Sequence, residues 1–232
     1  MNQGGSDVEG LLPAPEVLQI EVGLLQNFVE LLYCPKTREA AVVDPAWEPD
    51  RLLREIESLQ LNLRSILITH THNDHIEAVE AMVAATGARV FVHPHEQARV
   101  EATCRTLSPP AVYCPVHDRM DIAIGERGVR VLETFGHTVG GVCYLADGYV
   151  IAGDVLFVGG CGRTDMQGGD TNALWHSLQR LMALPEETRV FPGHDYGKTP
   201  TSTIGREILE NPYLRGDFEG FRALRERRRP TT

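Results

Sequence analysis

Three histidines and one aspartate lie within six residues of one another, at His70, His72, Asp74 and His75. They follow the apolar run 65–68 directly, so we expect them at the end of a buried strand. Residues two apart on an extended backbone point the same way, so His70 and His72 can reach one centre, while a turn into a helix would aim Asp74 and His75 at a second. Imidazole and carboxylate groups are typical ligands of zinc, iron and manganese. The spacing therefore predicts a metal site.

Three later segments each place a metal-binding side chain directly after an apolar run. They carry His137, Asp154 and His194, each preceded by a glycine. A single histidine or aspartate in such a place more often caps a turn than binds a metal. Together with residues 70–75, these strand ends instead indicate a shared centre for one or two metal ions.

The elements that must position these residues follow from the hydrophobic pattern. Short β-branched runs predict strands, and apolar residues that recur every three or four positions predict helices. The predicted strands cover 40–43, 65–69, 89–92, 129–132, 142–145, 149–151 and 189–191, and the predicted helices cover 52–59, 78–83, 170–182 and 202–210. Asp147 and Gly148 predict a tight turn between two strands. Helices beside strands in both halves favour a layered α/β sandwich.

The length of 232 residues and the hydrophobic content of 42% indicate one globular domain. We expect this domain to span residues 16–224, with flexible tails at 1–15 and 225–232. Lys and Arg number 22 against 32 Asp and Glu, so the formal net charge is −10. This charge disfavours binding to nucleic acid or to an anionic membrane surface.

The sequence also gives an expectation for the compartment. No stretch approaches the roughly 20 apolar residues of a membrane span, and the first ten residues lack the basic and apolar regions of a secretion signal. We therefore expect a cytoplasmic protein. Its five cysteines are an odd number without a CxxC pair, so reduced structural thiols are expected rather than disulfides or a thiolate zinc site.

Taken in order, these motifs resemble those of the metallo-β-lactamase superfamily. Its H-x-H-x-D-H motif matches residues 70–75, and its later ligands match His137, Asp154 and His194. The resemblance implies an αββα metallo-β-lactamase-like sandwich of two mixed sheets flanked by helices, with metals at one edge of the paired sheets. It also implies one metal held by His70, His72, His137 and Asp154, and a second held by Asp74, His75, Asp154 and His194.

The resemblance implies two divalent metal ions as cofactors, zinc in the first place, with iron and manganese as alternatives. Asp154 would bridge both ions, which lower the pKa of a shared water until a metal-bound hydroxide can attack the substrate. Asp74 would be a metal ligand and also the catalytic residue that orients this hydroxide or takes up its proton.

Residues 159–165 and 192–197 resemble one branch of the superfamily, which contains glyoxalase II and persulfide dioxygenase. These enzymes act on glutathione thioesters and on glutathione persulfide, so the resemblance implies a small anionic thiol-derived substrate such as a glutathione conjugate. Arg163 suits a carboxylate of such a substrate, unless it forms an internal salt bridge with Asp165. Tyr196 would line the substrate pocket, with plain packing as the alternative.

Two activities stay open within this branch. Bacterial thioester hydrolases with similar Pro-Gly-His-Asp-Tyr-Gly segments favour a metal-dependent hydrolase that cleaves a thioester of the hydroxyacylglutathione type. The alternative is an iron-dependent persulfide dioxygenase with a single iron held by His70, His137 and Asp154, because residues 159–165 and 201–204 look closer to that enzyme. Phe135 stands where many relatives have proline, and the sequence gives no reason for it.

Overall fold

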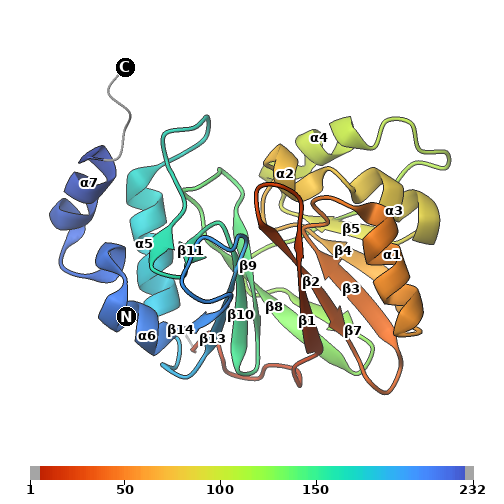
Figure 1. Cartoon of the computed structure of the whole chain (residues 1–232), viewed down its shortest axis with the longest axis horizontal. Helices are drawn as coiled ribbons and strands as arrows, with labels where there is room; N and C mark the ends of the chain where they lie inside the picture. The colour runs from red at the N-terminus through yellow and green to blue at the C-terminus, as the bar shows by residue number, and fades with distance from the viewer. Residues whose placement is uncertain (1–5, 228–232) are drawn as a thin grey trace.

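Residues 6–227 are described by the computed structural model, and two six-stranded sheets form their centre (Figure 1). The first sheet consists, in spatial order, of β1 (Glu16–Val22), β2 (Asn27–Tyr33), β3 (Glu39–Val43), β4 (Asn62–Leu67), β5 (Arg89–Val92) and β6 (Tyr113–Pro115). Strands β1 to β3 are antiparallel neighbours, whereas β3 to β6 run parallel. The carboxyl ends of β4 and β5 therefore lie at the same edge.

The second sheet is mixed as well. It consists, in spatial order, of β14 (Ser202–Thr203), β13 (Arg189–Pro192), β10 (Tyr149–Gly153), β9 (Val142–Ala146), β8 (Arg127–Glu133) and β7 (Asp121–Ile124). Strand β9 is antiparallel to both β8 and β10, and β13 is parallel to β10. Strands β8, β10 and β13 thus point in one direction. A two-stranded ribbon of β11 (Leu156–Phe157) and β12 (Gly160–Cys161) follows β10.

Helices cover the outer face of each sheet (Figure 1). Those of the first half are α1 (Pro49–Ser58), α2 (Asn73–Ile76), α3 (Val79–Thr86) and α4 (Pro94–Thr103). Those of the second half are α5 (Thr171–Met182), α6 (Ile204–Glu210), the 3-10 turn Pro212–Leu214 and α7 (Phe218–Arg227). Among residues 6–227, no helix has the length and apolar character required to cross a membrane.

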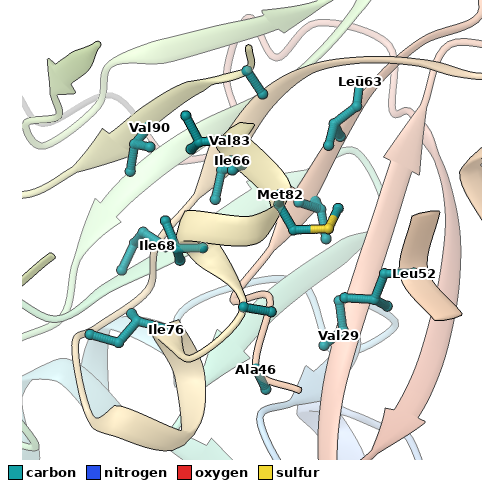
Figure 2. Packing of buried hydrophobic residues seen from close by; sticks show 14 of the residues in the cluster. Val29, Ala46, Leu52, Leu63, Ile66, Ile68, Ile76, Met82, Val83 and Val90 are labelled. Carbon is teal, nitrogen blue, oxygen red and sulfur yellow. The ribbon is translucent and has the colours of Figure 1, made fainter. Parts of the chain in front are cut away.

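Three clusters of buried apolar residues join the four layers of the fold. One lies between each sheet and its helices, and the third lies between the two sheets. The central strands are buried on both faces, and alternation along β4 sends Ile66 to the outer cluster and Leu67 to the cluster between the sheets. In Figure 2, Ile66 lies near Val83 of α3 and Val90 of β5, and Leu52 of α1 lies beside Val29 of β2 in the same cluster. The αββα sandwich is therefore the fold of this chain.

The predicted strands and helices are all present, with shifted ends. A difference in the type of element occurs at residues 202–210, where the predicted helix begins only at Ile204. Ser202 and Thr203 instead pair with β13, and the Thr203 hydroxyl accepts a hydrogen bond from the Arg206 amide as the helix cap. Helices α4 and α7 and strands β1, β6, β7, β11 and β12 were not predicted. Strand β6 and helix α4 are short or weakly amphipathic, so periodicity does not mark them.

Residues 6–15, part of the segment expected as a flexible tail, contact the domain through two arginines. The Arg130 guanidinium donates to the carbonyl oxygens of Asp7 and Glu9 at 3.1 and 2.7 Å, and Arg180 forms an ion pair with the Asp7 carboxylate. Residues 225–227, also expected in a tail, end helix α7. The rest of both predicted tails, 1–5 and 228–232, lies outside the described residues.

Candidate metal centre

The candidate ligands come from the carboxyl ends of strands in both sheets. Residues 70–75 follow β4, and Asp74 and His75 lie in the first turn of α2. His137, Asp154 and His194 follow β8, β10 and β13, which run in the same direction. Their carboxyl ends therefore share one edge, and the structure brings all seven predicted ligands together there.

The first group of ligand atoms belongs to His70, His72, His137 and Asp154, and these atoms lie within 4.8 Å of one another. His137 Nε2 is 2.9 Å from His72 Nδ1 and 3.4 Å from Asp154 Oδ2. His70 Nε2 is 3.9 Å from the same carboxylate oxygen. These distances leave room for one ion between the four groups.

The second group belongs to Asp74, His75 and His194, again within 4.8 Å of one another. His75 Nε2 and His194 Nε2 face each other at 3.2 Å. Asp154 completes this group, because its Oδ1 is 3.4 Å from His75 Nε2 and 3.5 Å from His194 Nε2. The two oxygens of Asp154 thus face different groups, as a bridging carboxylate requires.

Buried atoms without partners indicate that these groups suit a metal. His70 Nε2 and Asp154 Oδ1 are fully buried, and neither has a hydrogen-bond partner among the described residues. Unsatisfied buried polar atoms are rare in proteins because they lose the hydration of the unfolded chain. A bound cation would satisfy both atoms.

The protonation states of His70, His72 and Asp154 also suit the binding of a metal ion. Burial lowers the pKa of His70 well below its ordinary value and that of His72 to about 4, so both imidazoles are neutral at pH 7. Burial acts to raise the pKa of Asp154, but the histidines around it, His75 foremost, hold that pKa well below its usual range. Neutral imidazoles and an ionised carboxylate are the forms that coordinate divalent metals.

Hydrogen bonds at the other ring nitrogen fix the orientation of the histidines. His137 Nδ1 donates to the Arg163 carbonyl at 2.7 Å, and His194 Nδ1 donates to the Leu25 carbonyl at 2.9 Å. Each Nε2 then carries the lone pair and faces the cluster. Such outer contacts hold metal-binding imidazoles in the required tautomer.

Asp44 orients His75 and was missed by the sequence reasoning. Its Oδ2 is 3.0 Å from His75 Nδ1, and its Oδ1 accepts a hydrogen bond from the Thr69 amide at 2.7 Å. Asp44 has a positive φ of 44° just after β3, which is uncommon for a non-glycine residue. The Asp44-Pro45 pair at a strand end was the signal that could have indicated it.

Glu96 of α4 was also missed, and it joins two of the ligand loops. Its carboxylate is buried, accepts a hydrogen bond from the Thr71 hydroxyl between two ligand histidines, and accepts the Gly140 amide at 3.0 Å. Gly140 belongs to the loop that carries His137. One carboxylate therefore holds both loops at a fixed separation.

Two glycines allow the close approach of the loops. A Cβ at Gly162 would lie 1.9 Å from the Asp154 carbonyl oxygen and 2.9 Å from His137 Nδ1. A Cβ at Gly193 would lie 2.4 Å from Asp154 Oδ1. Any side chain at these positions would displace candidate ligands.

A pocket of about 450 Å³ opens beside the cluster. Tyr196 lines it, is 57% exposed, and stacks on the His194 ring at 4.5 Å between centroids. Arg163 lines it too, and its guanidinium forms the internal ion pair with Asp165 that the sequence left open. Arg99 of α4 also lines the pocket and was not predicted. These side chains surround space large enough for a small molecule.

Within the described part of the chain, Phe135 contacts Ser177 and His93. Its carbonyl accepts a hydrogen bond from the Ser177 hydroxyl of α5 at 2.7 Å, and its ring meets His93 edge-on at 5.3 Å. The carbonyl contact ties the loop before His137 to helix α5. Nothing in these contacts explains why phenylalanine stands here rather than proline.

Imidazoles and carboxylates gathered at one edge of an αββα sandwich define a metal-binding enzyme fold. Residues 28–194 match the family described as the Metallo-beta-lactamase superfamily, and the chain belongs to this superfamily. A likeness to hydroxyacylglutathione hydrolases and to ETHE1 places it in the glyoxalase II and persulfide dioxygenase-like branch.

Three comparisons illustrate this placement. The chain is 31% identical over 196 residues to "Probable polyketide biosynthesis zinc-dependent hydrolase PksB" of Bacillus subtilis, covering 84% of each chain. It is 37% identical over 220 residues to a hydroxyacylglutathione hydrolase of Rhodospirillum rubrum, covering 93% of this chain and 80% of the relative. The crystal structure of ETHE1 from Myxococcus xanthus is similar with a TM-score of 0.81 and 33% identity, covering 93% and 92% of the two chains.

Proposed function

We propose that this protein is a metal-dependent hydrolase that cleaves a thioester of the hydroxyacylglutathione type. The observation that carries the proposal is the pair of ligand groups that share Asp154, because two adjacent ions suit hydrolysis of an acyl group. The named activity of the Rhodospirillum rubrum relative supports the thioester as substrate.

The proposed ligands of the first ion are His70, His72, His137 and Asp154, and those of the second are Asp74, His75, Asp154 and His194. Zinc is the proposed metal, because histidine and carboxylate ligands suit it and the Bacillus subtilis relative is named zinc-dependent. Iron and manganese also bind such ligands, so metal analysis of the purified protein decides between them.

When bound, the two ions would supply a water of lowered pKa and would polarise the thioester carbonyl. Asp74 is the proposed catalytic residue that acts on that water. Its carboxylate lines the pocket, and its Oδ2 accepts a hydrogen bond from Asn27 Nδ2 at 3.1 Å. Asn27 also donates to the Asp74 carbonyl at 2.9 Å, which fixes the side chain.

The reaction balances with water as the second substrate. The water oxygen bonds to the acyl carbon, its proton passes to Asp74, and the carbon–sulfur bond breaks. Asp74 then returns the proton to the departing thiolate, so the products are a carboxylic acid and a thiol. Tyr196 is proposed as a substrate contact, because it lines the pocket beside Asp74. Arg163 also lines the pocket, and it would contact a substrate only through the guanidinium N–H groups that its ion pair with Asp165 leaves free.

Hydrolysis of S-lactoylglutathione by zinc-loaded protein tests the proposal. We expect Asp74→Asn to lower kcat by about 100- to 10,000-fold, the range for loss of a general acid–base group. His176→Ala is the matched control, because this histidine is exposed on α5 and outside the cluster. No hydrolysis by wild-type protein with a full metal complement would refute the proposed reaction.

Persulfide dioxygenase activity is the second candidate, supported by the likeness to ETHE1 of Myxococcus xanthus. It would use a single iron held by His70, His137 and Asp154, which are two histidines and a carboxylate, as in non-haem iron oxygenases. The test is oxygen uptake by iron-loaded protein with glutathione persulfide, with His137→Ala as the blank. Rapid uptake that survives His72→Ala would favour the dioxygenase over the two-metal hydrolase.

A further inference from the structure

Two arginines reach the pocket beside the metal centre, and their charges are in different states. Arg163 is neutralised within the chain, because the Asp165 carboxylate accepts its Nε at 2.7 Å and its Nη2 at 2.9 Å. Arg99 donates its Nη2 to the neutral Asn73 Oδ1 at 3.0 Å, and within residues 6–227 no carboxylate forms an ion pair with it. Arg99 therefore brings an uncompensated positive charge to the pocket.

The contact with Asn73 fixes where this charge lies. Asn73 stands between the candidate ligands His72 and Asp74, so the Arg99 guanidinium lies one side chain away from the metal cluster. Arg99 is exposed, and the Asn73 contact uses one of its five N–H donors, which leaves others for a ligand. The net charge of −10 repels anions from the molecule as a whole, so an anionic substrate needs such a local cation.

We propose that Arg99 binds a carboxylate on the thiol half of the substrate and thereby holds the thioester over the metal cluster. The inference rests on the proposed function, because a glutathione thioester carries two carboxylates in its thiol half. A guanidinium binds a carboxylate through two parallel charge-assisted hydrogen bonds. The glutathione sulfur lies on the middle residue of the tripeptide, so the carboxylate of its last residue lies within about 7 Å of the thioester.

Two thioesters with the same acyl group separate recognition from catalysis. S-lactoylglutathione carries the carboxylates, whereas the lactoyl thioester of N-acetylcysteamine has a neutral thiol half. In metal-loaded protein, we expect Arg99→Gln to lower kcat/KM for the first by about 10- to 100-fold, the loss of one charge-assisted contact. The same variant should change kcat/KM for the second by less than about twofold.

Arg54→Gln is the matched control, because it removes the same charge from an exposed position on α1, and we expect it to leave both rates unchanged. Equal losses on both thioesters in Arg99→Gln would overturn the inference, since Arg99 would then act only by supporting Asn73. An unchanged rate on both would overturn it as well.

Binding of S-methylglutathione, measured by calorimetry on metal-loaded protein, keeps this inference separate from the proposed reaction. If the wild type cleaves neither thioester, the proposed function fails, but binding still decides the role of Arg99. Binding at least about tenfold weaker in Arg99→Gln than in wild type and Arg54→Gln supports the carboxylate contact. Equal binding by all three proteins, or none by the wild type, refutes it.

Discussion

Glu30 provides a test of the electrostatics beneath the metal centre. It lies on β2 with 2% of its surface exposed, and its carboxyl accepts a hydrogen bond from Gln19 Nε2 at 3.2 Å. Burial raises its pKa from 4.5 to about 8, and the Asp44 carboxylate adds to the increase. We expect Glu30→Gln, which keeps the shape and removes the charge, to stabilise the protein at high pH.

The sign and size follow from the two pKa values. Below pH 4.5 the carboxyl is protonated in both the folded and the unfolded chain, so it imposes no cost. Between pH 4.5 and about 8 the unfolded chain releases the proton and the folded chain keeps it, so stability falls as pH rises. At about 1.4 kcal/mol per pKa unit, the full loss above pH 8 is about 5 kcal/mol.

The assay is urea unfolding of wild type and Glu30→Gln from pH 5 to 9. Both proteins are treated with chelator, so that metal release at low pH does not contribute. The variant should be equal to the wild type within about 1 kcal/mol at pH 5, and more stable by about 3 kcal/mol at pH 7 and about 5 kcal/mol at pH 9. Glu21→Gln, on the adjacent strand β1 and exposed, should show no such trend. A difference that does not change with pH would refute the reasoning.

Three further predictions concern the metal cluster. Glu96→Ala should weaken metal binding by about 10- to 100-fold in chelator competition, whereas Glu101→Ala, exposed on the same helix, should not. Gly162→Ala should abolish binding of at least one ion, as measured by metal analysis, because the added Cβ would clash with the Asp154 carbonyl. Gly160→Ala is the control, because its Cβ would meet nothing closer than 3.8 Å. Removing the metal with a chelator should lower the melting temperature in calorimetry, since ligands bound to the folded state stabilise it; an unchanged value would contradict a site of two ions.

The sequence indicated the candidate ligands most clearly where they are local or follow apolar strands. His70 and His72 have the two-residue spacing of a strand, and Asp74 and His75 follow at the turn into a helix. Few structural roles would require four metal-binding side chains within six residues. His137 and Asp154 follow strands whose β-branched runs are clear, so their place at a sheet edge could be inferred. The division of the ligands between two ions needed the family resemblance, because strand order is not encoded in local pattern.

The residues that the sequence did not indicate depend on contacts between distant segments. Glu96 and Thr71 are 25 positions apart, and they meet because β5 lies parallel to β4 and releases α4 at the same edge. His93-Pro94 after β5 did carry a local signal, since proline is favoured in the first turn of a helix. Arg99 could be assigned to the pocket only from the structure, because it lies on α4, which was not predicted.

The two sheets make unequal and complementary contributions to the cluster. The first sheet supplies residues 70–75 through one continuous segment, and the second supplies His137, Asp154 and His194 from three separate strand ends. The sheets already share an apolar cluster and a hydrogen bond from the Tyr144 hydroxyl to the Ile68 carbonyl at 2.8 Å. Ions held between the two groups would therefore connect the sheets at their edge, where Asp154 faces ligands from both, so the geometry of the site depends on how the sheets pack.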